Sequence, residues 1–373
     1  MPGRVKAPVP VDCAMDHSGR QARLREALQN SKLDFLLVTH PPNLRYLCGF
    51  TGSTGILLLG QRSSVFFTDG RYTEQARLEV ESARAVISRK PPLAEACARL
   101  DAGRRGTSLG IESDHMTVSA RSRLRQLLPR GVRLRESAGL VEQGRRVKEA
   151  AEIARLRAAV LVGDQLFSRA LEVIRPGVTE SEVAAELEYA ARRAGAEAMS
   201  FPTIVAAGTR SALPHGQASS ARIPRSGFVV LDFGVILAGY CSDMTRTVYV
   251  GRPTRRERSW YEAVREAQGA ATRAVRAGRV SGEVDQAARK VLQREGLGHY
   301  FTHSTGHGVG LEIHEAPRLA SRETEVLRAG MVVTIEPGVY LPGKGGVRIE
   351  DMVVVTEGGC EVLTPTGKEL ITV

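Results

Sequence analysis

Two aspartates lie in a segment that otherwise has the composition of a buried β-hairpin. Asp232 and Asp243 belong to residues 228–250, which are rich in Val, Ile and Thr with interrupting glycines. Aspartate is uncommon in strands, and its ionised form is costly to bury unless it is paired, hydrogen-bonded or bound to a metal. A turn centred on Leu237-Ala238 places the two aspartates directly opposite each other, with Cβ atoms about 4.5–5.5 Å apart. Like charges at that separation repel strongly unless a cation lies between them.

A second apolar segment repeats this arrangement with glutamates. Glu336 and Glu350 are equidistant from Gly343, so a hairpin loop centred on that residue places them opposite each other. A single acidic pair is readily explained by salt bridges within the sheet, with Arg246 and Arg348 as partners. Two pairs with the same geometry favour a site that holds divalent cations.

Histidines supply a further type of metal ligand. His303, His307 and His314 fall within twelve residues of a glycine-rich segment and make up three of the eight histidines in the chain. Four carboxylates and one imidazole suit two hard or borderline divalent ions, such as Mn²⁺, Co²⁺, Fe²⁺ or Zn²⁺. Two ions about 3.5–4 Å apart can share bridging ligands and a bridging hydroxide, as in aminopeptidase-type hydrolysis.

The elements that must position these residues form the second half of the chain. A helical pattern covers 148–174, and Thr179 with Glu182 has the spacing of a capping box that begins a second helix. Two more helices are expected over 257–276 and 281–296, between the two hairpin segments. This order indicates two similar halves, each of which contributes one hairpin.

The first part of the chain follows a different pattern. Strand-like and helical segments alternate from residue 20 to residue 128, which predicts an α/β sheet covered by helices. Pro41-Pro42 is interpreted as a break after the first strand. We therefore expect three regions, which are a flexible tail over 1–16, an N-terminal α/β domain over 17–147 and a catalytic domain over 148–373.

Composition narrows the classes of protein further. The 373 residues are 42% hydrophobic and 25% charged, as in a soluble globular protein, and we expect neither a membrane span nor a signal peptide. Five cysteines without C-x-x-C spacing fit a reducing compartment, so the expected location is the cytoplasm. The net charge of +11 is scattered along the chain and aromatic residues make up only 5%, which argues against a nucleic-acid partner.

These motifs resemble those of the pita-bread metallopeptidases, the family that includes methionine aminopeptidase, aminopeptidase P and prolidase. The resemblance implies a mixed α/β N-terminal domain of the creatinase/prolidase type, followed by a C-terminal pita-bread domain with pseudo-twofold halves. It also implies five metal ligands in chain order, which are Asp232 in Leu-Asp-Phe-Gly, Asp243 in Ser-Asp-Met-Thr, His307 in Gly-His-Gly-Val-Gly, Glu336 in Ile-Glu-Pro-Gly and Glu350 in Arg-Ile-Glu-Asp.

The same resemblance assigns roles around the metals. Glu336 is both a ligand and the group that moves a proton from the attacking water to the leaving nitrogen. His215, in Pro-His-Gly, and His314 stabilise the oxyanion or hold the substrate, and His303 helps to bind it. Arg348 supports the ligand carboxylates from behind.

The N-terminal motifs indicate the branch of the family. Residues Tyr46–Gly55 and Phe67–Ala76 resemble the N-terminal domain of aminopeptidase P and prolidase, which methionine aminopeptidases lack. Creatinase shares this two-domain build but has lost the metal ligands. The expected activity is therefore that of an Xaa-Pro aminopeptidase, which hydrolyses the bond before a penultimate proline through a metal-bridging hydroxide. Tyr340 is a candidate wall of the proline pocket.

Three alternatives remain open at this point. A prolidase restricted to Xaa-Pro dipeptides uses the same site, and a methionine-removing enzyme is disfavoured by the N-terminal domain. A binding protein with the pita-bread fold could use the positive charge to associate with nucleic acid, but such relatives typically lose ligands. The resemblance implies a homodimer with two divalent ions, of which Mn²⁺ is the first choice.

Overall fold

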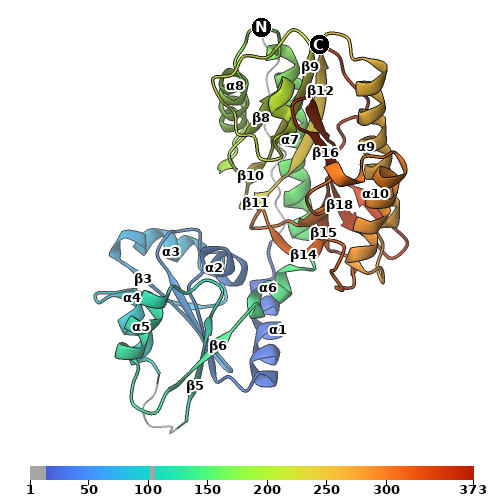
Figure 1. Ribbon diagram of the computed structural model, residues 1–373. Coiled ribbons are helices and arrows are strands. Elements are labelled where there is room, and N and C mark those ends of the chain that lie inside the picture. Colours follow the sequence, from blue (N-terminus) through green and yellow to red (C-terminus); the bar gives the residue numbers. More distant parts are fainter. Residues whose placement is uncertain (1–13, 101–105) are drawn as a thin grey trace. The chain divides into compact units, whose positions relative to one another are not determined.

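The computed structural model describes residues 14–100 and 106–373, so most of the expected N-terminal tail lies outside the described part (Figure 1). The described chain forms two compact units, Ala14–Arg145 and Arg146–Val373. Asp16, the last residue of the expected tail, caps the first helix by accepting a hydrogen bond from the Gly19 backbone. Among the described residues, no helix is long and apolar enough to span a membrane.

The unit Ala14–Arg145 is built on a six-stranded mixed sheet. Its strand order is β4-β3-β2-β1-β5-β6, with β1 antiparallel to β2 and parallel to β5. An apolar core from the central strands packs against α4 and α5. The strands are β1 (Phe35–Val38), β2 (Ile56–Gly60), β3 (Ser64–Asp69), β4 (Arg84–Ser88), β5 (Ser108–Glu112) and β6 (Arg133–Ser137). The α-helices are α1 (His17–Asn30), α2 (Pro41–Cys48), α3 (Thr73–Glu79), α4 (Pro92–Ala98), α5 (Val118–Leu127) and α6 (Leu140–Arg145).

The break predicted after the first strand is present, since β1 ends at Val38, but the sequence analysis missed that Pro41-Pro42 begin helix α2. Proline lacks a backbone N–H and has a fixed φ near the helical value, and both properties suit the first turn of a helix. The helix then ends at Gly49, whose left-handed φ of 79° closes it.

The unit Arg146–Val373 consists of two halves, as expected, and each combines two long helices with one hairpin. Helices α7 (Ala150–Val173) and α8 (Glu180–Arg193) share a core with β8 (Ile204–Ala207), β9 (Gly227–Phe233) and β12 (Met244–Val250). Helices α9 (Arg255–Ala274) and α10 (Ser281–Arg294) share another with the second hairpin. The remaining strands are β7 (Ala198–Met199), β10 (Val235–Leu237), β11 (Tyr240–Cys241), β13 (Gly306–Gly308), β14 (Glu315–Leu319), β15 (Val332–Ile335), β16 (Gly338–Leu341), β17 (Gly345–Arg348), β18 (Asp351–Val355) and β19 (Cys360–Val362).

The capping box predicted for α8 is present. The Thr179 hydroxyl accepts from the Glu182 backbone N–H at 3.1 Å, and the Glu182 carboxylate accepts from the Thr179 backbone N–H at 2.7 Å. Two otherwise unpaired donors at the helix start are thereby satisfied. The same device, from Thr254 and Glu257, begins α9.

The second hairpin has the predicted register. Ile335 pairs with Asp351 and Gly338 with Arg348, so Glu336 and Glu350 occupy opposed positions about Gly343. Both glutamates lie in a short break between strands rather than inside one.

The register predicted for the first hairpin is wrong. Its turn residues are Ala238 and Gly239, with φ of 48° and 81°, rather than Leu237-Ala238. Two consecutive left-handed residues form the tight turn that suits a twisted hairpin, and glycine adopts this φ without strain. Asp232 consequently pairs with Thr245, and Asp243 lies between β11 and β12.

Candidate metal centre

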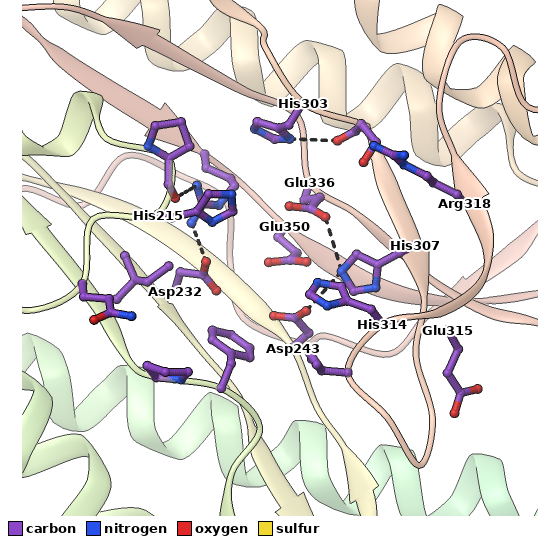
Figure 2. Close-up of a pocket in the computed structure, with 18 residues that line it drawn as sticks. His215, Asp232, Asp243, His303, His307, His314, Glu315, Arg318, Glu336 and Glu350 are labelled. Carbon is purple, nitrogen blue, oxygen red and sulfur yellow. Dashed lines mark hydrogen bonds and ion pairs between the residues drawn. The ribbon is translucent and has the colours of Figure 1, made fainter. Parts of the chain in front are cut away.

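A cavity of about 560 Å³ in the unit Arg146–Val373 collects nine of the ten residues that the sequence analysis assigned to the site (Figure 2). Tyr340 is the exception. The nine are contributed by both hairpins and by the segments before β9 and around β13, so the two halves meet at this cavity. They are His215, Asp232, Asp243, His303, His307, His314, Glu336, Arg348 and Glu350.

Four carboxylates lie together at this cavity, of which Asp232, Asp243 and Glu350 are buried and Glu336 is half-buried. Burial raises the pKa of Asp243 and of Glu350 well above their usual values, and the neighbouring carboxylates raise them further. Burial also raises the pKa of Glu336 to about 7, although the nearby Arg348 guanidinium opposes that shift. Burial and mutual repulsion therefore disfavour the simultaneous ionisation of Asp243, Glu336 and Glu350, and a bound cation would relieve both effects.

Arginine salt bridges do not explain this cluster. Arg348 forms an ion pair with Asp232 and donates through Nε to the Thr245 hydroxyl at 3.0 Å. Arg246 instead pairs with Asp351, at 2.7 Å, outside the cluster. Among the described residues, arginine or lysine ion pairs therefore reach only one of the four carboxylates.

His307 has the hydrogen-bonding pattern of a metal ligand. Its Nδ1 lies 2.9 Å from the Gly308 carbonyl oxygen, which can only accept, so Nδ1 carries the proton and Nε2 keeps a free lone pair. Nε2 lies 3.6 Å from Asp243 Oδ2 and 3.5 Å from Glu336 Oε1. Burial lowers the pKa of His307, which favours this neutral form.

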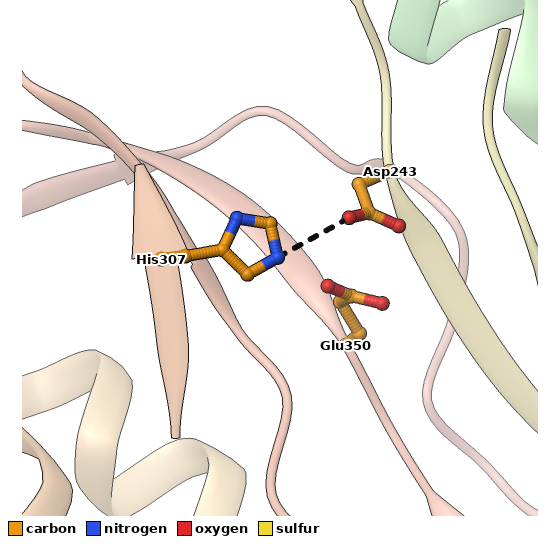
Figure 3. A group of neighbouring side chains, drawn as sticks. All are labelled: Asp243, His307 and Glu350. Atoms are coloured by element: carbon orange, nitrogen blue, oxygen red, sulfur yellow. Dashed lines mark ion pairs between the residues drawn. The ribbon is translucent and has the colours of Figure 1, made fainter. Parts of the chain in front are cut away.

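The donor set fits divalent cations. Ligand atoms of Asp243, His307 and Glu350 all lie within 4.8 Å of one another (Figure 3). Asp232 Oδ1 and Glu350 Oε1 are buried oxygens that accept no hydrogen bond from the described residues. Buried carboxylate oxygens without a donor are costly, and a cation among them removes that cost. The chemistry of these residues is thus that of a hard-metal site with one imidazole.

His314 lies beside this cluster. Its ring stands edge-on to that of His307, with centroids 4.4 Å apart, and burial lowers its pKa. The next residue, Glu315, forms a buried ion pair with Lys148 at 3.1 Å, which fixes the segment that carries His314.

His303 and Tyr340 belong to one hydrogen-bonded chain. Arg348 Nη1 donates to Tyr340 Oη at 2.6 Å, and Tyr340 Oη lies 2.9 Å from His303 Nε2. His303 Nδ1 lies 2.8 Å from the Ser304 carbonyl oxygen, and burial lowers the pKa of His303 to about 4. The sequence analysis expected Tyr340 to form a wall of the cavity, but Tyr340 is not among the residues that line it. It lies behind His303 and Arg348 and holds both in place.

Two residues with a clear position at the site were missed from the sequence. The Thr245 hydroxyl donates to Glu350 Oε2 at 2.8 Å and so connects the two hairpins. Arg318 lies opposite His307 in the β13–β14 pair and lines the cavity. The alternation of residues along 303–319 could have indicated Arg318 only if β14 had been recognised as a strand.

The metal-free protein is expected to lose stability as the pH rises from 4.5, the ordinary pKa of a glutamate, to about 7. Glu336, Asp243 and Glu350 all have raised pKa values, so the folded chain holds more protons than the unfolded chain across this interval. Linkage then requires the free energy of unfolding to fall with pH. Urea denaturation of chelator-treated protein at about pH 5 and about pH 7.5 measures the slope. Asp243→Asn should show a smaller slope, and equal slopes in the two proteins would contradict this prediction.

Each half of this unit combines a pair of helices with a hairpin, and the two halves meet at a cavity lined by carboxylates and histidines. This combination of fold and site defines a metal-dependent hydrolase. Residues 154–357 match the family described as metallopeptidase family M24, and residues 20–147 match the creatinase/prolidase N-terminal domain. The chain belongs to metallopeptidase family M24, and the resemblance drawn from its motifs is confirmed.

Relatives of known name agree with this assignment. The chain is 38% identical over 362 residues to the Xaa-Pro dipeptidase of Pyrococcus horikoshii, covering 94% of this chain and 97% of that one. The solved structure of Xaa-Pro dipeptidase from Bacillus anthracis superposes with a TM-score of 0.93 at 42% identity, covering 96% and 100%. That of X-Pro aminopeptidase from Thermotoga maritima has a TM-score of 0.86 at 35% identity, covering 92% and 98%.

Proposed function

We propose that this chain is a metal-dependent Xaa-Pro peptidase that cleaves the bond before proline, with Xaa-Pro dipeptides as preferred substrates. The observation that carries the proposal is the convergence of four carboxylates, His307 and Arg318 on one cavity. A bond to proline has no N–H, so a hydrolase cannot grip it through an amide proton and gains from polarising the carbonyl directly. The names of the relatives in Pyrococcus horikoshii and Bacillus anthracis support this choice of substrate.

The five residues that the sequence analysis named as metal ligands all line the cavity, and they would hold two divalent cations, with Mn²⁺ as the first candidate. When bound, such ions act as Lewis acids toward the carbonyl and lower the pKa of a water molecule toward neutrality. The oxygens without hydrogen-bond partners on Asp232 and Glu350 support this ligand set. The proposed ligands are Asp232, Asp243, His307, Glu336 and Glu350.

Other side chains would handle protons and substrate. The Glu336 side chain is 17% exposed, against 13% for Asp232 and 6% for Asp243, so its oxygens can reach a water in the cavity. We assign to Glu336 the transfer of a proton from that water to the prolyl nitrogen. His215 and His314 would donate hydrogen bonds to the oxyanion or to the substrate.

Arg318 supports the dipeptide preference. It is exposed at the cavity, and among the described residues no carboxylate forms an ion pair with it. A guanidinium binds a carboxylate with two parallel hydrogen bonds, and in an Xaa-Pro dipeptide the proline carries the free C-terminal carboxylate. A longer peptide has an amide at that place and gains less from Arg318.

Arg318→Ala is therefore expected to lower kcat/KM for Xaa-Pro by about ten- to hundredfold, mainly through KM, because a charge-assisted hydrogen bond contributes about 1.5–3 kcal/mol. The loss for the amide Xaa-Pro-NH₂ should be several times smaller, since this substrate lacks the carboxylate. Arg322→Ala, an exposed arginine three residues beyond β14, serves as the charge-matched control. Equal losses of kcat/KM for the acid and the amide would show that Arg318 does not bind the substrate carboxylate.

The function itself is tested with three substrates. Metal-loaded protein should cleave Xaa-Pro, should cleave Xaa-Pro-Yaa more slowly, and should leave Xaa-Ala-Yaa largely intact. Faster cleavage of Xaa-Pro-Yaa would assign the aminopeptidase activity, which the Thermotoga maritima neighbour favours as the second candidate. Equal cleavage of Xaa-Ala-Yaa would remove the proline requirement.

Assembly and location complete the proposal. We propose a homodimer in the cytoplasm, which the family resemblance and the five cysteines without C-x-x-C spacing support. Light scattering at the concentrations used for activity assays tests the oligomeric state. A fully active monomer would contradict the dimer.

A further inference from the structure

His215 lies on a long connection that has little regular structure of its own. The segment 208–218 leaves the end of β8, makes the short helix η2 (Gly208–Ala212) and then carries His215 and Gln217 to the cavity. Such a segment can place a side chain accurately only if its ends are fixed by the surrounding fold. Both of its ends meet at one carboxylate, that of Glu180.

Glu180 is the first residue of helix α8, and its side chain is fully buried. Oε1 accepts a hydrogen bond at 2.8 Å from the backbone N–H of Ala207, the residue just before the segment. Oε2 accepts from the Ser219 backbone N–H at 3.1 Å and from the Ser219 hydroxyl at 2.6 Å, just after the segment. One carboxylate therefore joins the two ends.

The same carboxylate also controls the interior of the segment. Arg210, within η2, approaches it with Nε at 3.1 and 3.0 Å from the two oxygens, and donates through Nη2 to the Gln217 carbonyl oxygen at 2.9 Å. Gln217 in turn donates its backbone N–H to the His215 carbonyl oxygen at 2.9 Å. A continuous hydrogen-bonded path thus leads from Glu180 to His215.

Only a carboxylate can accept at both ends. Glutamine has the same shape as Glu180 but one oxygen and one NH₂ group. In either orientation its NH₂ group faces a backbone N–H, of Ala207 or of Ser219, and one end of the segment loses its acceptor. The remaining contacts of the segment persist, because Arg348 still donates to the Pro214 carbonyl oxygen at 3.0 Å.

We propose that Glu180 is a positioning residue for the reaction, which acts by holding His215 at its place in the cavity. This inference rests on the proposed function, in which His215 contacts the substrate. Glu180 touches neither the cavity nor the proposed metal ligands, so its effect on turnover passes through the segment 208–218. The metal content is accordingly independent of it.

The test combines Glu180→Gln with His215→Ala in a double-mutant cycle on Mn²⁺-loaded protein. Glu180→Gln alone should lower kcat about ten- to hundredfold, since small misplacements of a substrate-contacting group have effects of that size. In the His215→Ala background the same change should cost less than about twofold, because the residue it positions is gone. Metal stoichiometry should match that of the unsubstituted protein throughout.

Two further variants separate positioning from general stability. Glu182→Gln, two residues away on α8, weakens the capping box but contacts neither Ala207 nor Ser219, and should leave kcat within about twofold. Ser219→Ala removes the hydroxyl, which donates to Glu180 and accepts from the Ala221 backbone N–H at 3.1 Å, but keeps the Ser219 backbone N–H on Glu180. It should give a smaller loss than Glu180→Gln, again only when His215 is present.

Specific outcomes overturn the inference. Equal losses from Glu180→Gln in the presence and absence of His215 would show an independent effect, and unchanged kcat in Glu180→Gln would show no effect at all. Full turnover in His215→Ala alone would instead contradict the proposed role of His215, and the inference would fail with it for that separate reason.

Discussion

Asp243→Asn is expected to lose its metal and to lower kcat by about a thousandfold or more, because loss of Lewis-acid stabilisation worth about 4 kcal/mol corresponds to that factor. Asp243 is buried within the cluster, and its pKa is raised first by this burial and then by Glu350, Asp232 and Glu336. A neutral amide at this position removes one charge and one anionic ligand from the proposed site. Elemental analysis after dialysis, together with kcat at saturating Mn²⁺, measures both effects.

The same variant should lose activity but should not lose stability when no metal is bound. Without metal, Asp243→Asn removes one of several repelling carboxylates, so its free energy of unfolding at neutral pH should equal or exceed that of the unsubstituted protein. Addition of Mn²⁺ should then stabilise the unsubstituted protein but not the variant. Asp164→Asn, on α7, is the matched control, because Asp164 accepts from the Thr366 hydroxyl outside the cavity. Full metal occupancy and turnover in Asp243→Asn would contradict the proposed ligand set.

The two hairpins show how far strand arithmetic on a sequence can go. The loop centre at Gly343 could be predicted because an odd loop rich in Gly and Pro leaves one symmetric arrangement for Glu336 and Glu350. For the first hairpin the sequence analysis placed the turn at Leu237-Ala238, the midpoint of Asp232 and Asp243, but the actual turn depends on which residues adopt a left-handed φ. Ala238 takes such a φ with Gly239, although alanine rarely does, and the register moved by one residue on each strand.

The proposed ligands were recognisable because burial of charge is costly. An acidic residue inside an apolar strand segment is already a signal in the sequence, and four of them outweigh the salt-bridge alternative. The supporting groups carry no such signal. Thr245, Arg318 and Glu180 are ordinary residue types at ordinary positions, and they act through contacts that only the fold brings together. Glu180 and Ser219 are 39 residues apart, and Thr245 and Glu350 are 105 residues apart.

Tyr340 shows why a correct motif can lead to an incorrect role. Its position four residues after Glu336 placed it near the site, but the direction of its side chain depends on partners from elsewhere. The pairing of β16 with β17 brings Arg348 to its hydroxyl, and His303 accepts on the other side. The residue therefore orders the site from behind.

His215→Ala and His314→Ala are expected to keep their metal and fold while lowering kcat by about a hundred- to a thousandfold, the usual effect of removing a donor aimed at developing charge. Both rings line the cavity. Neither is one of the five proposed ligands, which are Asp232, Asp243, His307, Glu336 and Glu350. Metal analysis, thermal unfolding and kcat on an Xaa-Pro dipeptide test the three parts together.

His299→Ala is the matched control, because His299 packs on Tyr300 outside the cavity, and it should stay within about twofold of full activity. Stoichiometric loss of metal from His314→Ala would instead show that His314 is a ligand. His314→Ala is the more informative of the two substitutions, because the His314 ring centroid lies 4.4 Å from that of the proposed ligand His307.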